Sequence, residues 1–171
     1  IVTIRRPYAL NALSEDLLAQ LATIVDEVEA KRTIDGHPVR ALLLRGVGRA
    51  FMAGADVNGF MNIGAAAVTA LAAKVIGVFG RLERLPVPVI ALIDGFALGG
   101  GNELAMSTHH RIVTENALMG QPEIKLGIIP GYGGMQRLPR LVGPRKAAEL
   151  ALNGEAIDGH CAVALGLADQ F

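Results

Sequence analysis

The 171-residue sequence has no tryptophan, two tyrosines and five phenylalanines, although half of its residues are hydrophobic. Its core must therefore be built from aliphatic side chains and alanine, which suits the packed layers of an α/β protein. There is a single cysteine, Cys161. A disulfide within the chain is excluded, and we expect a reducing compartment, with a cytoplasmic location as the first expectation.

The sequence also has no net charge, since Lys plus Arg and Asp plus Glu number 16 each. No overall field favours nucleic acid or an anionic membrane, so we expect neither as a partner. The longest apolar candidate, residues 65–79, is shorter than the roughly 20 residues of a membrane span and contains Lys74 and Gly77. With one cysteine and four histidines in no ligand spacing, we expect no metal site.

Apolar residues recur at helical spacing from Ser14, a candidate N-cap, to Lys31, and again over residues 65–85. Continuous apolar runs, typical of strands buried on both faces, occupy four segments. They are residues 39–46, 89–95, 110–115 and, more briefly, 117–120. Strands that alternate with helices predict an α/β fold with stacked parallel sheets, in one domain over residues 1–171.

Two glycine-rich loops, "FMAGADV" and "LGGGNELA", each follow a predicted buried strand. Glycine lets a ligand approach the backbone, and a helix start leaves N–H groups unpaired. The triple glycine taken alone is better explained by a tight crossover from strand to helix. However, the carboxyl ends of parallel strands are where such sheets bind ligands. Two loops there could each direct one N–H at the same carbonyl oxygen, forming an oxyanion hole.

Two glutamates lie among apolar neighbours beside these loops. Glu103 follows the triple glycine, and Glu123 follows Pro122. Separately, Glu103 could complement a helix dipole and Glu123 could form a salt bridge with Lys125. Together they could provide general acid–base chemistry, because two buried carboxylates have separated proton affinities.

Five segments, which cover nearly the whole chain in order, resemble the crotonase, or enoyl-CoA hydratase/isomerase, family. They are "RPYALNALS", "GRAFMAGADV", "DGFALGGGNELAMS", "GQPEIKLGIIPGYGGMQRLPRLVG" and "LNGEAIDGHCAVALGLAD". The resemblance implies a spiral of β-β-α turns with surrounding helices. The sequence departs from the family's usual pattern at Met52, which replaces a small residue, and at Asn102, which replaces a frequent cysteine, small or hydrophobic residue.

By resemblance, the backbone N–H groups of Ala55 and Gly100 would hold the thioester oxygen of an acyl-CoA. Glu103 would take a proton from the attacking water, and Glu123 would handle the proton at the α carbon. The Gly131 N–H would support Glu123. The coenzyme A part of the substrate would run along backbone in two segments and the oxyanion hole. These residues are Tyr8, Ala9, Leu10, Ala53, Ala55, Asp56 and Gly100.

The resemblance implies hydration of a 2-trans-enoyl-CoA to a 3-hydroxyacyl-CoA, as in fatty-acid β-oxidation, with no cofactor because coenzyme A is part of the substrate. Both glutamates are present, which favours a hydratase over a double-bond isomerase. A hydratase or hydrolase of cyclic acyl-CoA esters is a further alternative within the family. A non-catalytic RNA-binding or scaffold relative is an alternative of another class, which the neutral charge disfavours.

Compared with the family pattern, the first strand is partial and the C-terminal helical region is missing. In relatives that region drives assembly, so the resemblance implies a homo-oligomer, a trimer or dimer of trimers, for a full-length protein. In a eukaryote the resemblance would place the protein in the mitochondrial matrix or the peroxisome.

Overall fold

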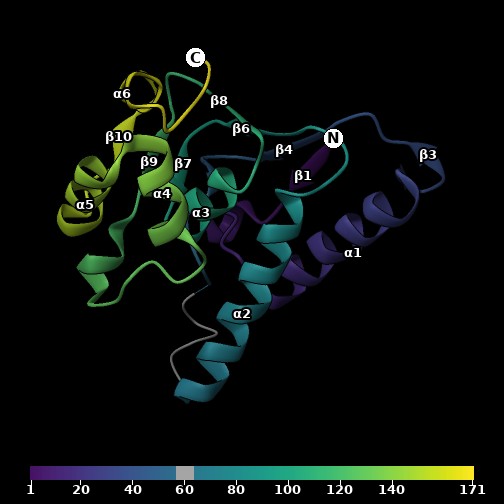
Figure 1. Cartoon of the computed structure of the whole chain (residues 1–171), viewed down its shortest axis with the longest axis horizontal. Coiled ribbons are helices and arrows are strands. Elements are labelled where there is room, and N and C mark those ends of the chain that lie inside the picture. The colour runs from purple at the N-terminus through teal and green to yellow at the C-terminus, as the bar shows by residue number, and fades with distance from the viewer. Residues whose placement is uncertain (57–63) are drawn as a thin grey trace.

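The computed structural model describes residues 1–56 and 64–171. Two four-stranded sheets lie at its centre (Figure 1). The first is entirely parallel, in the order β1 (Val2–Ile4), β4 (Leu42–Gly46), β6 (Val89–Ile93), β8 (His110–Val113). The second has the order β10 (Ile157–Asp158), β9 (Leu118–Gly120), β7 (Phe96–Leu98), β5 (Ala50–Met52), in which only β10 is antiparallel.

The chain visits the two sheets in turn. β4 is followed by β5 and helix α2 (Ala65–Leu82), and β6 by β7 and α3 (Gly100–Met106). β8 is followed by β9, the 3₁₀ helix η3 (Pro122–Leu126) and α4 (Gly134–Val142). Gly95 forms one corner with a φ of +79°, where a Cβ atom would overlap the Arg49 carbonyl. The predicted spiral of β-β-α turns with parallel sheets is confirmed.

The remaining elements lie at the two ends of the chain. The short helix η1 (Pro7–Ala9) precedes α1 (Glu15–Lys31), and the hairpin of β2 (Thr33–Ile34) and β3 (His37–Pro38) follows it. α5 (Pro144–Asn153) and α6 (Gly159–Leu165) lie near the C-terminus. The predicted cap is confirmed, since the Ser14 side chain accepts a hydrogen bond from Leu17 N–H at 3.2 Å. In Figure 1, α1 and α2 lie on one side of the sheets, and α4, α5 and α6 on the other.

Several boundaries differ from those expected from the sequence. β5 and β7 fall in segments interpreted as a loop and a turn, and both are strands of only three residues beside glycine. Strands this short show no alternation of apolar and polar residues in the sequence. They form because they pair with each other and with β9, which lies far along the chain. α2 ends at Leu82 rather than residue 85, before the "PVP" segment.

α2 is buried only toward its C-terminal end, at Val75, Val78, Phe79 and Leu82. Complete burial of a side chain such as Phe79 contributes about 1.5–3 kcal/mol to stability. The N-terminal turns of α2 extend away from the sheets in Figure 1. By length and composition alone this helix could cross a membrane, so the expected absence of a membrane span stays a prediction.

Candidate active site

The two predicted backbone donors meet where β5 and β7 end. Because β5 and β7 are parallel neighbours, the loop with Ala55 and the start of α3 at Gly100 emerge at the same edge of the sheet. A Cβ atom on Gly100 would lie 3.5 Å from the Ala55 nitrogen. Neither the Ala55 nor the Gly100 N–H donates a hydrogen bond within residues 1–56 and 64–171. The site therefore holds two adjacent, unpaired backbone donors.

Glu103 lies on α3 and is 1% exposed. Its Oε1 accepts hydrogen bonds from the N–H groups of Tyr132, at 2.8 Å, and Gly134, at 2.7 Å. Burial raises the pKa of Glu103, opposed by these two hydrogen bonds and by the positive charge of Arg137. Its partners come from another loop, so a helix-dipole role on α3 does not account for its contacts.

Glu123 lies on η3 and is 8% exposed. The expected alternative, a salt bridge with Lys125, is not formed, since Lys125 pairs with Glu155 at 3.0 Å. Burial, with a smaller contribution from the negative charge of Glu103, raises the pKa of Glu123 to about 7. A Cβ atom on Gly99 would lie 2.9 Å from Glu123 Oε1, so the glycine triplet makes room for this carboxylate.

Gln121 is a site residue that the sequence interpretation missed. It directly follows β9 and is 1% exposed. In the amide orientation that pairs its nitrogen with acceptors, it donates to Glu123 Oε1 at 3.2 Å and to the Gly99 carbonyl at 3.3 Å. A Cβ atom on Gly134 would meet both the Gln121 amide and, at 2.9 Å, Glu103 Oε1. The Gln121 amide thus lies between the two carboxylates. In the sequence, its position two residues before Glu123 is the feature that could have indicated a role in the site.

The expected hydrogen bond from Gly131 to Glu123 is not formed among the described residues. The next amides of the same loop, those of Tyr132 and Gly134, donate to Glu103 instead. The loop therefore supports the other glutamate of the pair.

The two segments predicted to bind coenzyme A lie side by side. Ala53 N–H donates to the Leu10 carbonyl at 3.1 Å, and Asp56 N–H donates to the Leu13 carbonyl at 2.9 Å. Tyr8 is 84% exposed beside them, and Ala9 completes the same short helix. The structure thus gathers the predicted residues along one edge next to Ala55.

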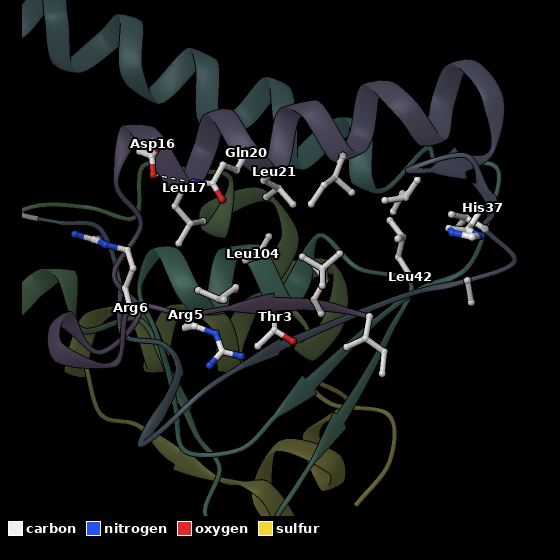
Figure 2. Close-up of a pocket in the computed structure, with 18 of the residues that line it drawn as sticks. Thr3, Arg5, Arg6, Asp16, Leu17, Gln20, Leu21, His37, Leu42 and Leu104 are labelled. Atoms are coloured by element: carbon white, nitrogen blue, oxygen red, sulfur yellow. Dashed lines mark hydrogen bonds between the residues drawn. The ribbon is translucent and has the colours of Figure 1, made fainter.

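A separate cavity of about 890 Å³ lies between α1 and the strands β1 and β4 (Figure 2). Figure 2 shows Leu17 and Leu21 of α1 above Thr3 and Arg5, with His37 at one end. Neither glutamate lines it. The candidate active site is therefore assigned from the hydrogen bonds and buried carboxylates, and not from the size of this cavity.

Comparisons with known proteins agree with this fold. The sequence profile of the enoyl-CoA hydratase/isomerase family matches residues 1–171. The chain is 46% identical to a protein named "Probable enoyl-CoA hydratase" of Bacillus subtilis and 42% identical to the "Crotonyl-CoA hydratase" of Syntrophomonas wolfei. These matches cover 98% and 99% of this chain but 63% and 64% of the relatives.

A crystal structure of enoyl-CoA hydratase from Bacillus anthracis superposes with a TM-score of 0.91 at 37% identity, covering 98% of this chain and 64% of that one. The chain thus spans a little under two thirds of the length of these relatives. The match over all 171 residues, together with the shared fold, shows that the chain belongs to the enoyl-CoA hydratase/isomerase family.

Proposed function

We propose that the protein hydrates a 2-trans-enoyl-CoA thioester to the 3-hydroxyacyl-CoA. The observation that carries the proposal is the pair of buried carboxylates, Glu103 and Glu123, held on either side of Gln121 beside two unpaired backbone amides. Crotonyl-CoA, named in the S. wolfei relative, is the natural first substrate to test.

In the proposed reaction the thioester oxygen accepts hydrogen bonds from the Ala55 and Gly100 N–H groups. These donors stabilise the negative charge that develops on the oxygen as water adds to the β carbon. Coenzyme A would extend along the exposed edge near Tyr8 and Ala53. The proposed reaction needs no redox cofactor, because hydration transfers no electrons, and the two backbone N–H groups provide the polarisation of the thioester carbonyl.

The two glutamates lie in different surroundings, which supports different roles. Burial raises the pKa of Glu103, but two N–H donors and the charge of Arg137 oppose this shift and favour the carboxylate form, which suits a base that takes a proton from water. Glu123, with a pKa of about 7, is protonated in part of the population at neutral pH and suits the acid. The water oxygen bonds to the β carbon, Glu103 takes its proton, and Glu123 protonates the α carbon. Transfer of the proton from Glu103 back to Glu123 then restores the site.

The proposal is tested by the loss of enoyl absorbance when the chain is mixed with crotonyl-CoA. Glu103→Gln should lower kcat by about 10²- to 10⁴-fold, the range of general acid–base catalysis. Glu149→Gln, on the exposed face of α5 beside Lys146, is the matched control and should retain activity. Full activity of Glu103→Gln would contradict the role given to Glu103.

The same assay separates the alternatives. A 3-enoyl-CoA tested beside the 2-enoyl-CoA distinguishes an isomerase, and cyclic enoyl-CoA esters distinguish the ring-specific relatives. RNA binding that weakens steeply with salt, without turnover of any thioester, would instead support the non-catalytic alternative.

We also propose that the protein assembles with copies of itself. An exposed apolar run supports this proposal: Leu126, Ile128 and Ile129 are 66%, 54% and 77% exposed. Neighbouring large apolar side chains on one surface mark protein–protein contacts. Light scattering coupled to size exclusion should give a mass above the 17.9 kDa of one chain, and Ile129→Asp should reduce it.

A further inference from the structure

Arg137 of α4 connects the candidate active site to the end of α2. Its side chain is mostly buried. Its Nε donates to Glu83 Oε1 at 2.5 Å, and its Nη1 donates to the Tyr132 carbonyl at 3.0 Å. A Cβ atom on Gly133, where φ is +106°, would overlap the guanidinium. Arg137 therefore lies directly against the backbone of the loop over residues 132–134.

That loop is also what holds Glu103. The N–H of Tyr132 donates to the Glu103 carboxylate, while the carbonyl of the same residue accepts from Arg137. Gly134 supplies the second N–H to Glu103 and is the first residue of α4. Arg137 thus binds the same loop residue that binds the carboxylate, and Glu83, 54 positions away in sequence, holds Arg137 in place.

The ionisable groups around Glu103 come from three elements. Arg137 of α4 is positive, whereas Glu123 of η3 is the second carboxylate and Tyr132 of the loop is a neutral phenol. Burial, with a smaller contribution from Glu103, raises the pKa of Tyr132 to about 12. Arg137 is the cation among these groups that favours ionised Glu103.

We propose that Arg137 is a positioning residue for Glu103, with Glu83 as its anchor. It fixes the loop over residues 132–134 around the carboxylate and supplies the positive charge that the buried carboxylate faces. The catalytic part of this inference rests on the proposed hydratase function. The electrostatic part does not, because it concerns the titration of Glu103 in the protein alone.

The test uses two variants of the chain that separate charge from hydrogen bonding. Arg137→Gln keeps an amide donor but removes the charge, whereas Arg137→Lys keeps the charge but has a single donor group. The titration of Glu103 is followed by NMR with ¹³C-labelled glutamate, and its resonance is assigned by its loss in Glu103→Gln. In Arg137→Gln, Glu103 should titrate at a higher pH than in the wild type, and in Arg137→Lys it should titrate close to the wild type.

Turnover of crotonyl-CoA supplies the second readout. Arg137→Gln should lower kcat by about 10- to 100-fold, as expected when a catalytic group is displaced slightly, and should move the acidic limb of the pH profile to higher pH. Compared with Arg137→Gln, Arg137→Lys should have a higher kcat, and the acidic limb of its pH profile should lie at the same pH as in the wild type. Arg81→Gln is the control, because Arg81 lies on α2 and forms ion pairs with Asp26 and Glu29 away from the site.

An unchanged Glu103 titration in folded Arg137→Gln overturns the inference. If Arg137→Gln does not fold, Arg137→Lys carries the test, and wild-type kcat in that variant would overturn the positioning role. A wild-type chain that does not hydrate crotonyl-CoA contradicts the proposed function instead, and the NMR titration still decides the inference.

Discussion

On the face formed by α1 and α2, Arg81 forms ion pairs with Asp26 and Glu29 at the surface. In the candidate active site, Glu103 is buried and accepts its hydrogen bonds from backbone amides. Exposed ion pairs are worth about 0–1 kcal/mol, whereas a buried carboxylate must recover a large desolvation cost from fixed donors. Polar groups on the helix face are therefore replaceable, and those in the site constrain both geometry and protonation.

The glycines of the two regions differ in the same way. In the site, Gly99, Gly101 and Gly134 leave room for a carboxylate, a strand backbone and an amide. On α2, Gly77 has nothing within 4 Å of the place a Cβ would occupy. If the site is built for chemistry and the helix face for packing, equivalent substitutions should have different consequences in the two regions.

Glu123→Gln should give the largest effect, a loss of kcat of about 10²- to 10⁴-fold, because it removes the proposed acid.

The same variant should gain stability at high pH. With the pKa of Glu123 raised from 4.5 to about 7, the folded state binds more protons than the unfolded state between these values. The free energy of unfolding therefore falls as pH rises through this window, by up to about 3 kcal/mol.

Urea denaturation at several pH values measures this stability difference. Glu123→Gln should show a flatter decline than the wild type between pH 4.5 and about 7 and should be the more stable protein above that range. Glu149→Gln, at an exposed position, should follow the wild-type curve. If the free energy of unfolding changed with pH in the same way in the wild type and in Glu123→Gln, the buried carboxylate would behave like a surface one and the comparison would fail.

Gly101→Ala and Gly77→Ala test the two regions with one substitution. At Gly101 the added methyl would overlap the Met52 backbone carbonyl, so α3 must move away from β5 at a cost of about 1–3 kcal/mol. At Gly77, inside α2 and open to solvent, alanine should stabilise by about 0.5–1 kcal/mol because it favours the helix. Thermal unfolding followed by circular dichroism gives both values, and shifts of the same sign would refute the comparison.

Local patterns in the sequence predicted the buried strands, the Ser14 cap and the glycine loops that the fold brings together. They did not predict β5 and β7, whose three-residue strands exist through pairing across the sheet. The family resemblance implied a hydrogen bond from Gly131 to Glu123, whereas the same loop donates to Glu103 through Tyr132 and Gly134. The role of Arg137 depends on a contact with Glu83, far along the chain, which no local spacing encodes. Gln121 lies only two residues from Glu123, but its contacts with Gly99 and Gly134 likewise come from the fold.

Asn102, one of the departures from the family pattern, and Asn11 give the finest comparison. Both are fully buried. Asn11 donates to the carbonyls of Val47 and Ala50 and accepts from the Arg6 N–H, at 2.9, 2.7 and 2.8 Å. In the part of the chain that the structure describes, neither Oδ1 nor Nδ2 of Asn102 has a partner. A buried polar group without a partner destabilises a protein, whereas a satisfied one contributes to stability.

Asn102→Leu should therefore raise the free energy of unfolding by about 1 kcal/mol, since it removes two unsatisfied atoms. Asn11→Leu should lower it by about 2–3 kcal/mol through the lost hydrogen bonds, with added strain because φ is +58° there. Urea denaturation of both variants measures the two changes in the free energy of unfolding. A loss of stability in Asn102→Leu equal to that in Asn11→Leu would mean that Asn102 is hydrogen-bonded in solution, and that the amide next to Glu103 belongs to the polar network of the site.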